Sequence, residues 1–107
     1  MLLTGKNAVI TGCLQGIGKA TLEVFASQGA NVFACCQAEE ESFTQYIAEL
    51  SDKYGVEIIP VYFDLFDEEA IKKGAGLIQK SKKPIDILVN VAGVTLDAFF
   101  HMATMDQ

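Results

Sequence analysis

The stretch TGCLQGIG, residues 11–18, links a short β-rich run (KNAVIT, 6–11) to a run with apolar residues on one helical stripe (IGKATLEVFASQ, 17–28). Gly12 allows a tight turn at positive φ, and Gly16 lacks the Cβ that would keep a phosphate away from the main chain. Gly18 allows the helix to pack closely on the strand. Because free N–H groups and the helix dipole favour an anion, this junction predicts a pyrophosphate site. A glycine-rich turn without a ligand is the alternative for the loop alone.

The same strand and helix unit repeats along the chain. We predict further strands over 30–36, 56–63 and 85–91 and further helices over 39–53 and 67–80. Strands rich in Val, Ile and Phe without strict alternation are typical of parallel strands whose two faces are covered by helices. Right-handed crossovers predict the strand order 3-2-1-4, and Pro60 agrees because a proline within a sheet belongs at an edge. The predicted fold class is α/β, a Rossmann-like doubly wound parallel sheet with helices on both faces, forming one unit over residues 1–107.

The two later helices have recognisable starts. The helix from 39 opens with three glutamates, which we interpret as complements to the helix dipole rather than as a binding group, and it buries Phe43, Ile47 and Leu50 on one stripe. Asp67 is the expected N-cap of the next helix, in which Gly74 and Gly76 each cost about 1 kcal/mol relative to alanine. We therefore expect that helix to be the weakest.

Further motifs lie at the ends of the third and fourth predicted strands. Asp64-Leu65 follows the third strand, and IDILVNVAG, residues 85–93, contains the fourth strand and the turn after it. With the three residues between the first two glycines of TGCLQGIG, these motifs resemble the short-chain dehydrogenase/reductase family, and the resemblance covers the chain from Lys6 to its end. The stretch GVTLD, residues 93–97, is similar to a loop of bacterial 3-oxoacyl-acyl-carrier-protein reductases.

The resemblance implies a dinucleotide site built from three places. The loop would surround the pyrophosphate and the adjoining ribose with Gly12, Cys13, Gln15, Gly16, Ile17 and Gly18. Asp64 would accept a hydrogen bond from the adenine amino group and Leu65 would back the ring, although a strand-end carboxylate without a ligand is the alternative. Asn90, Ala92 and Gly93 would line the ribose and nicotinamide side, largely through main-chain atoms. The family usually has a second asparagine where Val91 stands, which weakens a side-chain role at that position.

The choice between NAD and NADP depends on a few side chains. Cys36 takes the place where NAD-binding members carry an acid that holds the ribose diol. NADP-binding members often supply a basic residue at the positions of Gln15 and Gln37, which carry no charge here. The missing acid and the reductase-like loop favour NADP, whereas the acidic residues 39–41 favour NAD. We expect NADP, with NAD as the alternative.

The family's proton donor has no counterpart in these 107 residues. It is a tyrosine in a Tyr-x-x-x-Lys helix, assisted by a serine and an asparagine, and the lysine lowers the pKa of the tyrosine so that it can protonate the carbonyl oxygen. Tyr46, Tyr54 and Tyr62 each lack a lysine four residues later. The resemblance therefore implies the cofactor-binding part of an NAD(P)H-dependent carbonyl or 3-oxoacyl reductase, with no catalytic residue in the chain and no turnover alone. A carbonyl compound or acyl thioester would be substrate only in a longer form. A non-catalytic nucleotide-binding or self-associating module is the alternative.

Composition limits the partners and the location. Eight basic residues against 14 acidic ones give a net charge of −6, and Lys80, Lys82 and Lys83 lie at a predicted helix end, so we expect no nucleic-acid partner. We also expect no membrane span and no metal site, His101 included. Three cysteines favour a reducing compartment, hence the cytoplasm, and Cys35 and Cys36 should face opposite sides of a strand. The strand 85–91 has no lysine or proline to protect an edge, so we expect self-association.

Overall fold

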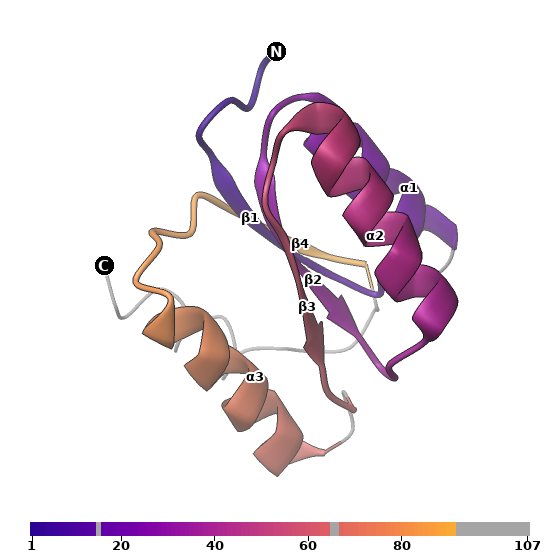
Figure 1. The fold of residues 1–107 in the computed structure, drawn as a ribbon. Coiled ribbons are helices and arrows are strands. Elements are labelled where there is room, and N and C mark those ends of the chain that lie inside the picture. Colours follow the sequence, from indigo (N-terminus) through magenta and orange to yellow (C-terminus); the bar gives the residue numbers. More distant parts are fainter. Residues whose placement is uncertain (15, 65–66, 92–107) are drawn as a thin grey trace.

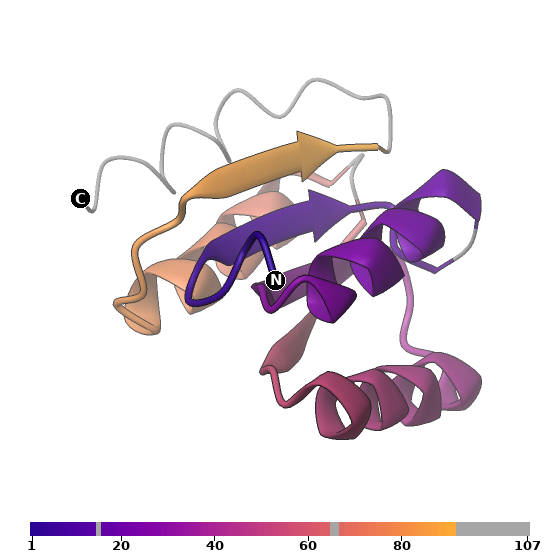
Figure 2. The same ribbon diagram turned by 90° about the horizontal axis from the view of Figure 1, so that it is seen from above.

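The computed structural model describes residues 1–14, 16–64 and 67–91. The strands are β1 (Asn7–Thr11), β2 (Asn31–Cys36), β3 (Ile58–Tyr62) and β4 (Ile87–Asn90), and the helices are α1 (Gly16–Ser27), α2 (Glu41–Tyr54) and α3 (Glu68–Lys80). The four strands are parallel in the order β3-β2-β1-β4, which confirms the predicted topology. Helices α1 and α2 cover one face of the sheet and α3 covers the other (Figures 1 and 2).

Successive residues of the strands enter two separate cores. Ala8 and Ile10 of β1 pack under α1 and α2, whereas Val9 packs under α3. Cys36 lies in the first core and Cys35 in the second, so the prediction that these two side chains face opposite sides is confirmed. Both faces of the central strands are therefore apolar, which explains the absence of strict alternation in the sequence.

Pro60 lies on the edge strand β3, and the ladder shows why it is tolerated there. The Glu57 carbonyl accepts from the Val32 N–H at 2.9 Å, and the Phe63 N–H donates to the Cys36 carbonyl at 2.9 Å. Odd-numbered residues of this segment thus bond to β2, and Pro60 turns its nitrogen away from the sheet. The missing N–H costs no ladder hydrogen bond and blunts the outer edge.

The helix ends agree with the sequence in part. The Asp67 side chain accepts from the Glu69 and Ala70 N–H groups at 3.0 and 3.3 Å, which confirms it as the N-cap of α3. The prediction of three glutamates in the first turn of α2 was wrong: Glu40 has an extended backbone and precedes the helix, so only Glu41 lies in that turn. Gly74 has a packing role that its helix propensity does not show, because a Cβ there would lie 2.7 Å from the Phe63 ring.

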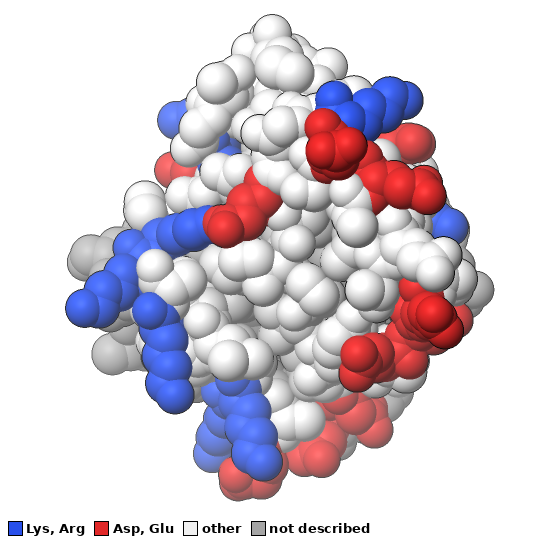
Figure 3. All heavy atoms as spheres, in the orientation of Figure 1, with Lys and Arg blue, Asp and Glu red and all other residues white. Residues whose placement is uncertain are grey.

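The charged side chains are unevenly spread over the face shown in Figure 3. Most lysines in this view lie on the side of α3 and most acidic side chains on the side of α2, and each group includes side chains of the opposite sign. Within the described residues, no helix is long and apolar enough to cross a membrane, and no group of three or more His, Cys, Asp or Glu side chains could hold a metal ion.

Candidate functional site

The carboxyl ends of the parallel strands lie at one edge of the sheet, and the predicted site residues follow them there. Strand β1 has β2 on one side and β4 on the other, so the chain order reverses next to it. In Figure 2 the arrowheads of β1 and β4 point the same way, and the glycine loop continues from β1. Open α/β sheets bind ligands at such a reversal point, outside the carboxyl ends of the strands.

Gly12 has the positive φ that the sequence predicts, and Gly16 has one that the sequence did not predict. Gly12 has φ 71° and Gly16 has φ 62°, both in the left-handed region. A Cβ on Gly18 would lie 1.8 Å from the Gly12 carbonyl oxygen, so the first turn of α1 is seated directly on the loop. A Cβ on Gly16 would meet no atom within 4 Å. Position 16 therefore favours glycine because of its positive φ rather than because of a steric contact, and the space next to its Cα is open.

The first turn of α1 suits an anion. It carries no acidic side chain, whereas the first turns of α2 and α3 carry Glu41 and the pair Glu68 and Glu69. The positive end of the α1 dipole is therefore left without a carboxylate of its own helix. Ile17, the second residue of α1, is 75% exposed, so a large apolar side chain stands next to the open loop.

Cys13 lies beneath the loop rather than on its outer surface. Its side chain is fully buried, its Sγ donates to the Ile10 carbonyl at 3.2 Å, and its N–H donates to the Cys35 carbonyl at 3.2 Å. Burial, with the charge of Cys36 as a smaller cause, raises the pKa of the Cys13 thiol to about 12. Only the main chain of Cys13 can face a ligand, and its buried neutral thiol anchors the loop.

Cys36 is the last residue of β2, the position where the family resemblance implies a side chain that contacts the adenosine ribose. Its side chain is only 3% exposed and packs in the core under α2. Burial, followed by the charge of Glu40, raises the pKa of this thiol to about 12. The exposed side chains after β2 are those of residues 37–40, and Glu40 makes no capping hydrogen bond with its side chain.

Thr11 joins the carboxyl ends of β1 and β4. Its buried Oγ1 donates to Asn90 Oδ1 at 3.0 Å and accepts from the Val91 N–H at 3.1 Å. The hydroxyl thus holds the start of the turn after β4 beside the glycine loop. Thr11 was not among the site residues predicted from the sequence, and the available signal was its position immediately before Gly12.

The remaining predicted residues fall into two groups. Asp64 follows β3 at the same edge of the sheet with an exposed side chain, and its carbonyl accepts from the Asp67 N–H at 3.0 Å. Four predicted site residues lie outside the described residues: Gln15, Leu65, Ala92 and Gly93. The structure therefore brings the glycine loop and Asn90 together, and it places Asp64 at the same edge.

Comparison with known proteins agrees with this geometry. The family model for short chain dehydrogenases matches residues 6–107. The chain is 38% identical over 105 residues to 3-oxoacyl-acyl-carrier-protein reductase FabG of Aquifex aeolicus, covering 97% of this chain and 42% of that protein. It is 38% identical over 106 residues to 2,3-dihydro-2,3-dihydroxybenzoate dehydrogenase of Bacillus subtilis, covering 98% and 40% of the two chains.

Solved structures show the same relationship. L-sorbose reductase from Gluconobacter frateurii, complexed with NADPH and L-sorbose, superimposes with a TM-score of 0.76 at 33% identity, covering 88% of this chain and 36% of that one. The chain thus spans less than half the length of these relatives. The glycine loop, the strand order and these matches together show that the chain belongs to the short-chain dehydrogenase/reductase family.

Proposed function

We propose that the chain binds the adenosine and pyrophosphate part of a nicotinamide dinucleotide at its glycine loop. The observation that carries the proposal is the contact of Gly18 with Gly12, which seats the positive end of α1 on a loop with two left-handed glycines. Main-chain atoms of the loop, including those of Cys13, would surround the pyrophosphate, and Ile17 would contact the adjoining ribose. Asp64 would bind the adenine amino group, and Asn90 would lie on the nicotinamide side.

The cofactor that we propose is NADP, with NAD as the alternative. No carboxylate stands at the end of β2, where Cys36 is buried. The exposed glutamates at 39–41 oppose a 2′-phosphate and keep NAD open. Among the structural neighbours, L-sorbose reductase is complexed with NADPH, which supports the proposal.

For the longer protein we propose NAD(P)H-dependent carbonyl reduction. A hydride would pass from the nicotinamide to the carbonyl carbon, and a proton would pass to the carbonyl oxygen. The relatives FabG and L-sorbose reductase support a 3-oxoacyl thioester or another carbonyl compound as the substrate class. Because residues 1–107 contain no Tyr-x-x-x-Lys pattern, we expect no turnover from these residues alone. A steady oxidation of NADPH with a 3-oxoacyl thioester by the pure chain would contradict this.

A matched pair of glycine variants tests the binding site. Gly16 (φ 62°) and Gly55 (φ 65°, the C-cap of α2) have nearly the same left-handed backbone, and a Cβ on either meets nothing within 4 Å. A valine at either position carries similar strain, about 1–2 kcal/mol. Gly16→Val should abolish calorimetric binding of NADPH and ADP, whereas Gly55→Val should leave it unchanged. Equal affinity of both variants would remove the glycine loop from the proposed site.

We also propose self-association, through the outer edge of β4. The Asn31 N–H donates to the Lys6 carbonyl at 2.9 Å, so the even-numbered residues of β1 bond to β2, and Val9 and Thr11 bond to β4. Since Val9 lies opposite Leu88 in the parallel ladder, Ile87 and Val89 bond to β1, and Leu88 turns its backbone groups outward. Within the described residues β1 is the one strand next to β4, and β4 has no counterpart of Pro60. Leu88→Pro should remove an outward N–H without breaking the ladder to β1 and should yield monomers in sedimentation. An unmodified chain that sediments as a monomer at all concentrations would overturn this.

We propose the cytoplasm as the location of the protein. The three cysteines are buried and form no disulfide, which supports a reducing compartment.

A further inference from the structure

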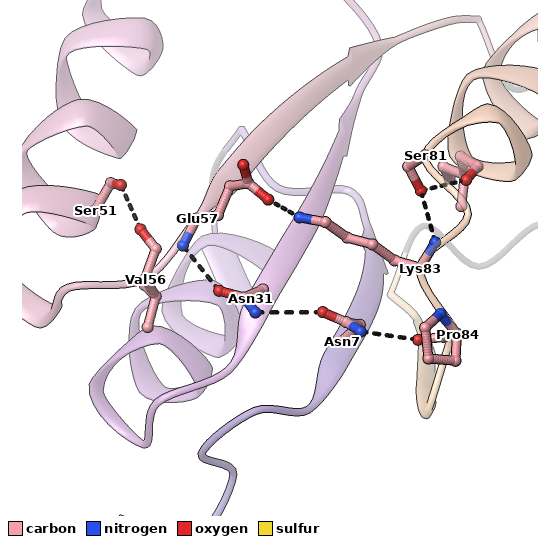
Figure 4. A network of polar contacts seen from close by, with 9 residues as sticks. Asn7, Asn31, Ser51, Val56, Glu57, Ser81, Lys83 and Pro84 are labelled. Carbon is pink, nitrogen blue, oxygen red and sulfur yellow. Dashed lines mark hydrogen bonds and ion pairs between the residues drawn. The ribbon is translucent and has the colours of Figure 1, made fainter.

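A ring of polar contacts crosses the sheet at its amino end, opposite the candidate site (Figure 4). The Glu57 N–H donates to Asn31 Oδ1 at 2.9 Å, and Asn31 Nδ2 donates to Asn7 Oδ1 at 3.3 Å. Asn7 Nδ2 then donates to the Pro84 carbonyl at 3.0 Å. The ring closes because Lys83, which precedes Pro84, forms an ion pair with Glu57. The contacts thus connect the segments that enter β3, β2, β1 and β4.

Asn7 is the member of the ring that holds β4. Its N–H donates to Asp86 Oδ2 at 2.8 Å, and its carbonyl accepts from the Asp86 N–H at 2.8 Å. Its side-chain amide donates toward Pro84 and accepts from Asn31, and the residue is 7% exposed. Three of these four contacts reach the segment that leads into β4. An amide is needed here because one end must accept and the other must donate.

The register of β4 on β1 depends on such end contacts. Strand β4 has four residues, and its apolar side chains enter both cores: Ile87 and Val89 the first, Leu88 the second. A shift by one residue exchanges the two faces, but apolar side chains would still cover both of them. The hydrophobic pattern therefore specifies this register weakly. Asn7 fixes the strand at its amino end, and Thr11 fixes it at Asn90 and Val91.

We propose that Asn7 is a positioning residue of the dinucleotide site, acting through β4 from the opposite end of β1. It sets where Asn90 and the turn after it lie relative to the glycine loop. This inference rests on the proposed function. The glycine loop follows β1 and holds the adenosine and pyrophosphate part, whereas the end of β4 serves the nicotinamide side. Loss of the Asn7 contacts to 84–86 therefore weakens the binding of the whole dinucleotide more than that of ADP.

The test compares one substitution at two neighbouring positions. Asn7→Asp keeps an acceptor for Asn31 Nδ2 but loses the donor to the Pro84 carbonyl and adds a charge beside Asp86. Asn31→Asp makes the same chemical and charge change on β2, which does not pair with β4. Calorimetric titrations of ADP and of NADPH or NADH, whichever binds the unmodified chain more tightly, give the ratio of the two affinities. Asn7→Asp should lower the ratio of dinucleotide to ADP affinity about five- to tenfold, and Asn31→Asp should change it less than twofold.

Amide hydrogen exchange provides a second readout that needs no ligand. Asn7→Asp should lower the protection of the Ile87 and Val89 amides, which bond to β1, and spare the amides of β2. Asp86→Ala removes the carboxylate that accepts from the Asn7 N–H, and it changes an exposed residue just before β4. This variant should give the same exchange pattern, and it replaces Asn7→Asp if that variant does not fold. Equal loss of ADP and dinucleotide affinity, or unchanged protection of β4, would overturn the positioning role. An unmodified chain that binds neither ligand would contradict the proposed function, and the exchange data would still test Asn7.

Discussion

Gly18→Ala should destabilise the chain strongly, although alanine is the better helix former. The added Cβ would lie 1.8 Å from the Gly12 carbonyl oxygen and 2.6 Å from its carbonyl carbon. Non-bonded heavy atoms rest about 3.5 Å apart, so the first turn of α1 would have to move by more than roughly 1.5 Å. Overpacking costs about 1–3 kcal/mol even where side chains can adjust. Here the atoms that the Cβ would meet belong to the backbone and cannot rotate away, so we expect a loss of about 3 kcal/mol.

Gly76→Ala in α3 is the matched control. A Cβ there meets nothing within 4 Å, and the position is helical, so the substitution should stabilise the chain by about 1 kcal/mol. Urea denaturation followed by far-ultraviolet circular dichroism measures both variants, and their free energies of unfolding should differ by about 4 kcal/mol. An unfolded Gly18→Ala chain beside a folded Gly76→Ala chain agrees with this expectation. A Gly18→Ala chain as stable as the unmodified one would refute the seating of α1 on the loop.

Two further predictions follow from buried polar groups. Thr11→Val removes the hydroxyl that contacts Asn90 and Val91, so it should lower the free energy of unfolding by about 2 kcal/mol. Thr11→Ser keeps the hydroxyl and should retain most of the stability. Equal losses of stability for the two variants in urea denaturation would contradict this. Burial raises the pKa of the Cys13 and Cys36 thiols from 9.0 to about 12, so between these values the unfolded chain binds fewer protons than the folded one. The free energy of unfolding should therefore fall as the pH rises above 9, by about 1.4 kcal/mol per pH unit for each thiol. Cys13→Ala should make this decrease with pH less steep. A free energy of unfolding that does not change between pH 9 and pH 11 would show that the thiols are accessible to solvent.

Local sequence signals predicted the elements and their order. Apolar periodicity located the seven helices and strands of the described residues to within a few positions, and the crossover rule with Pro60 predicted the strand order. The positive φ of Gly12 and the close packing at Gly18 also followed from the sequence, because the demands on a turn between a strand and a helix are set within a few residues.

The structure alone decided which polar groups meet across the sheet. Thr11 and Asn90 are 79 residues apart, as are Asn7 and Asp86, and no periodicity links such positions. The direction of the Cys13 and Cys36 side chains was also a tertiary result, because the packing of α1 and α2 on the sheet buries both thiols. The sequence by itself determined a parallel α/β sheet with a glycine-rich loop between the first strand and the first helix, since both depend on short-range backbone geometry. Only the tertiary structure determined how β4 is held beside that loop, because its register depends on polar side chains that folding brings together at the two ends of β1.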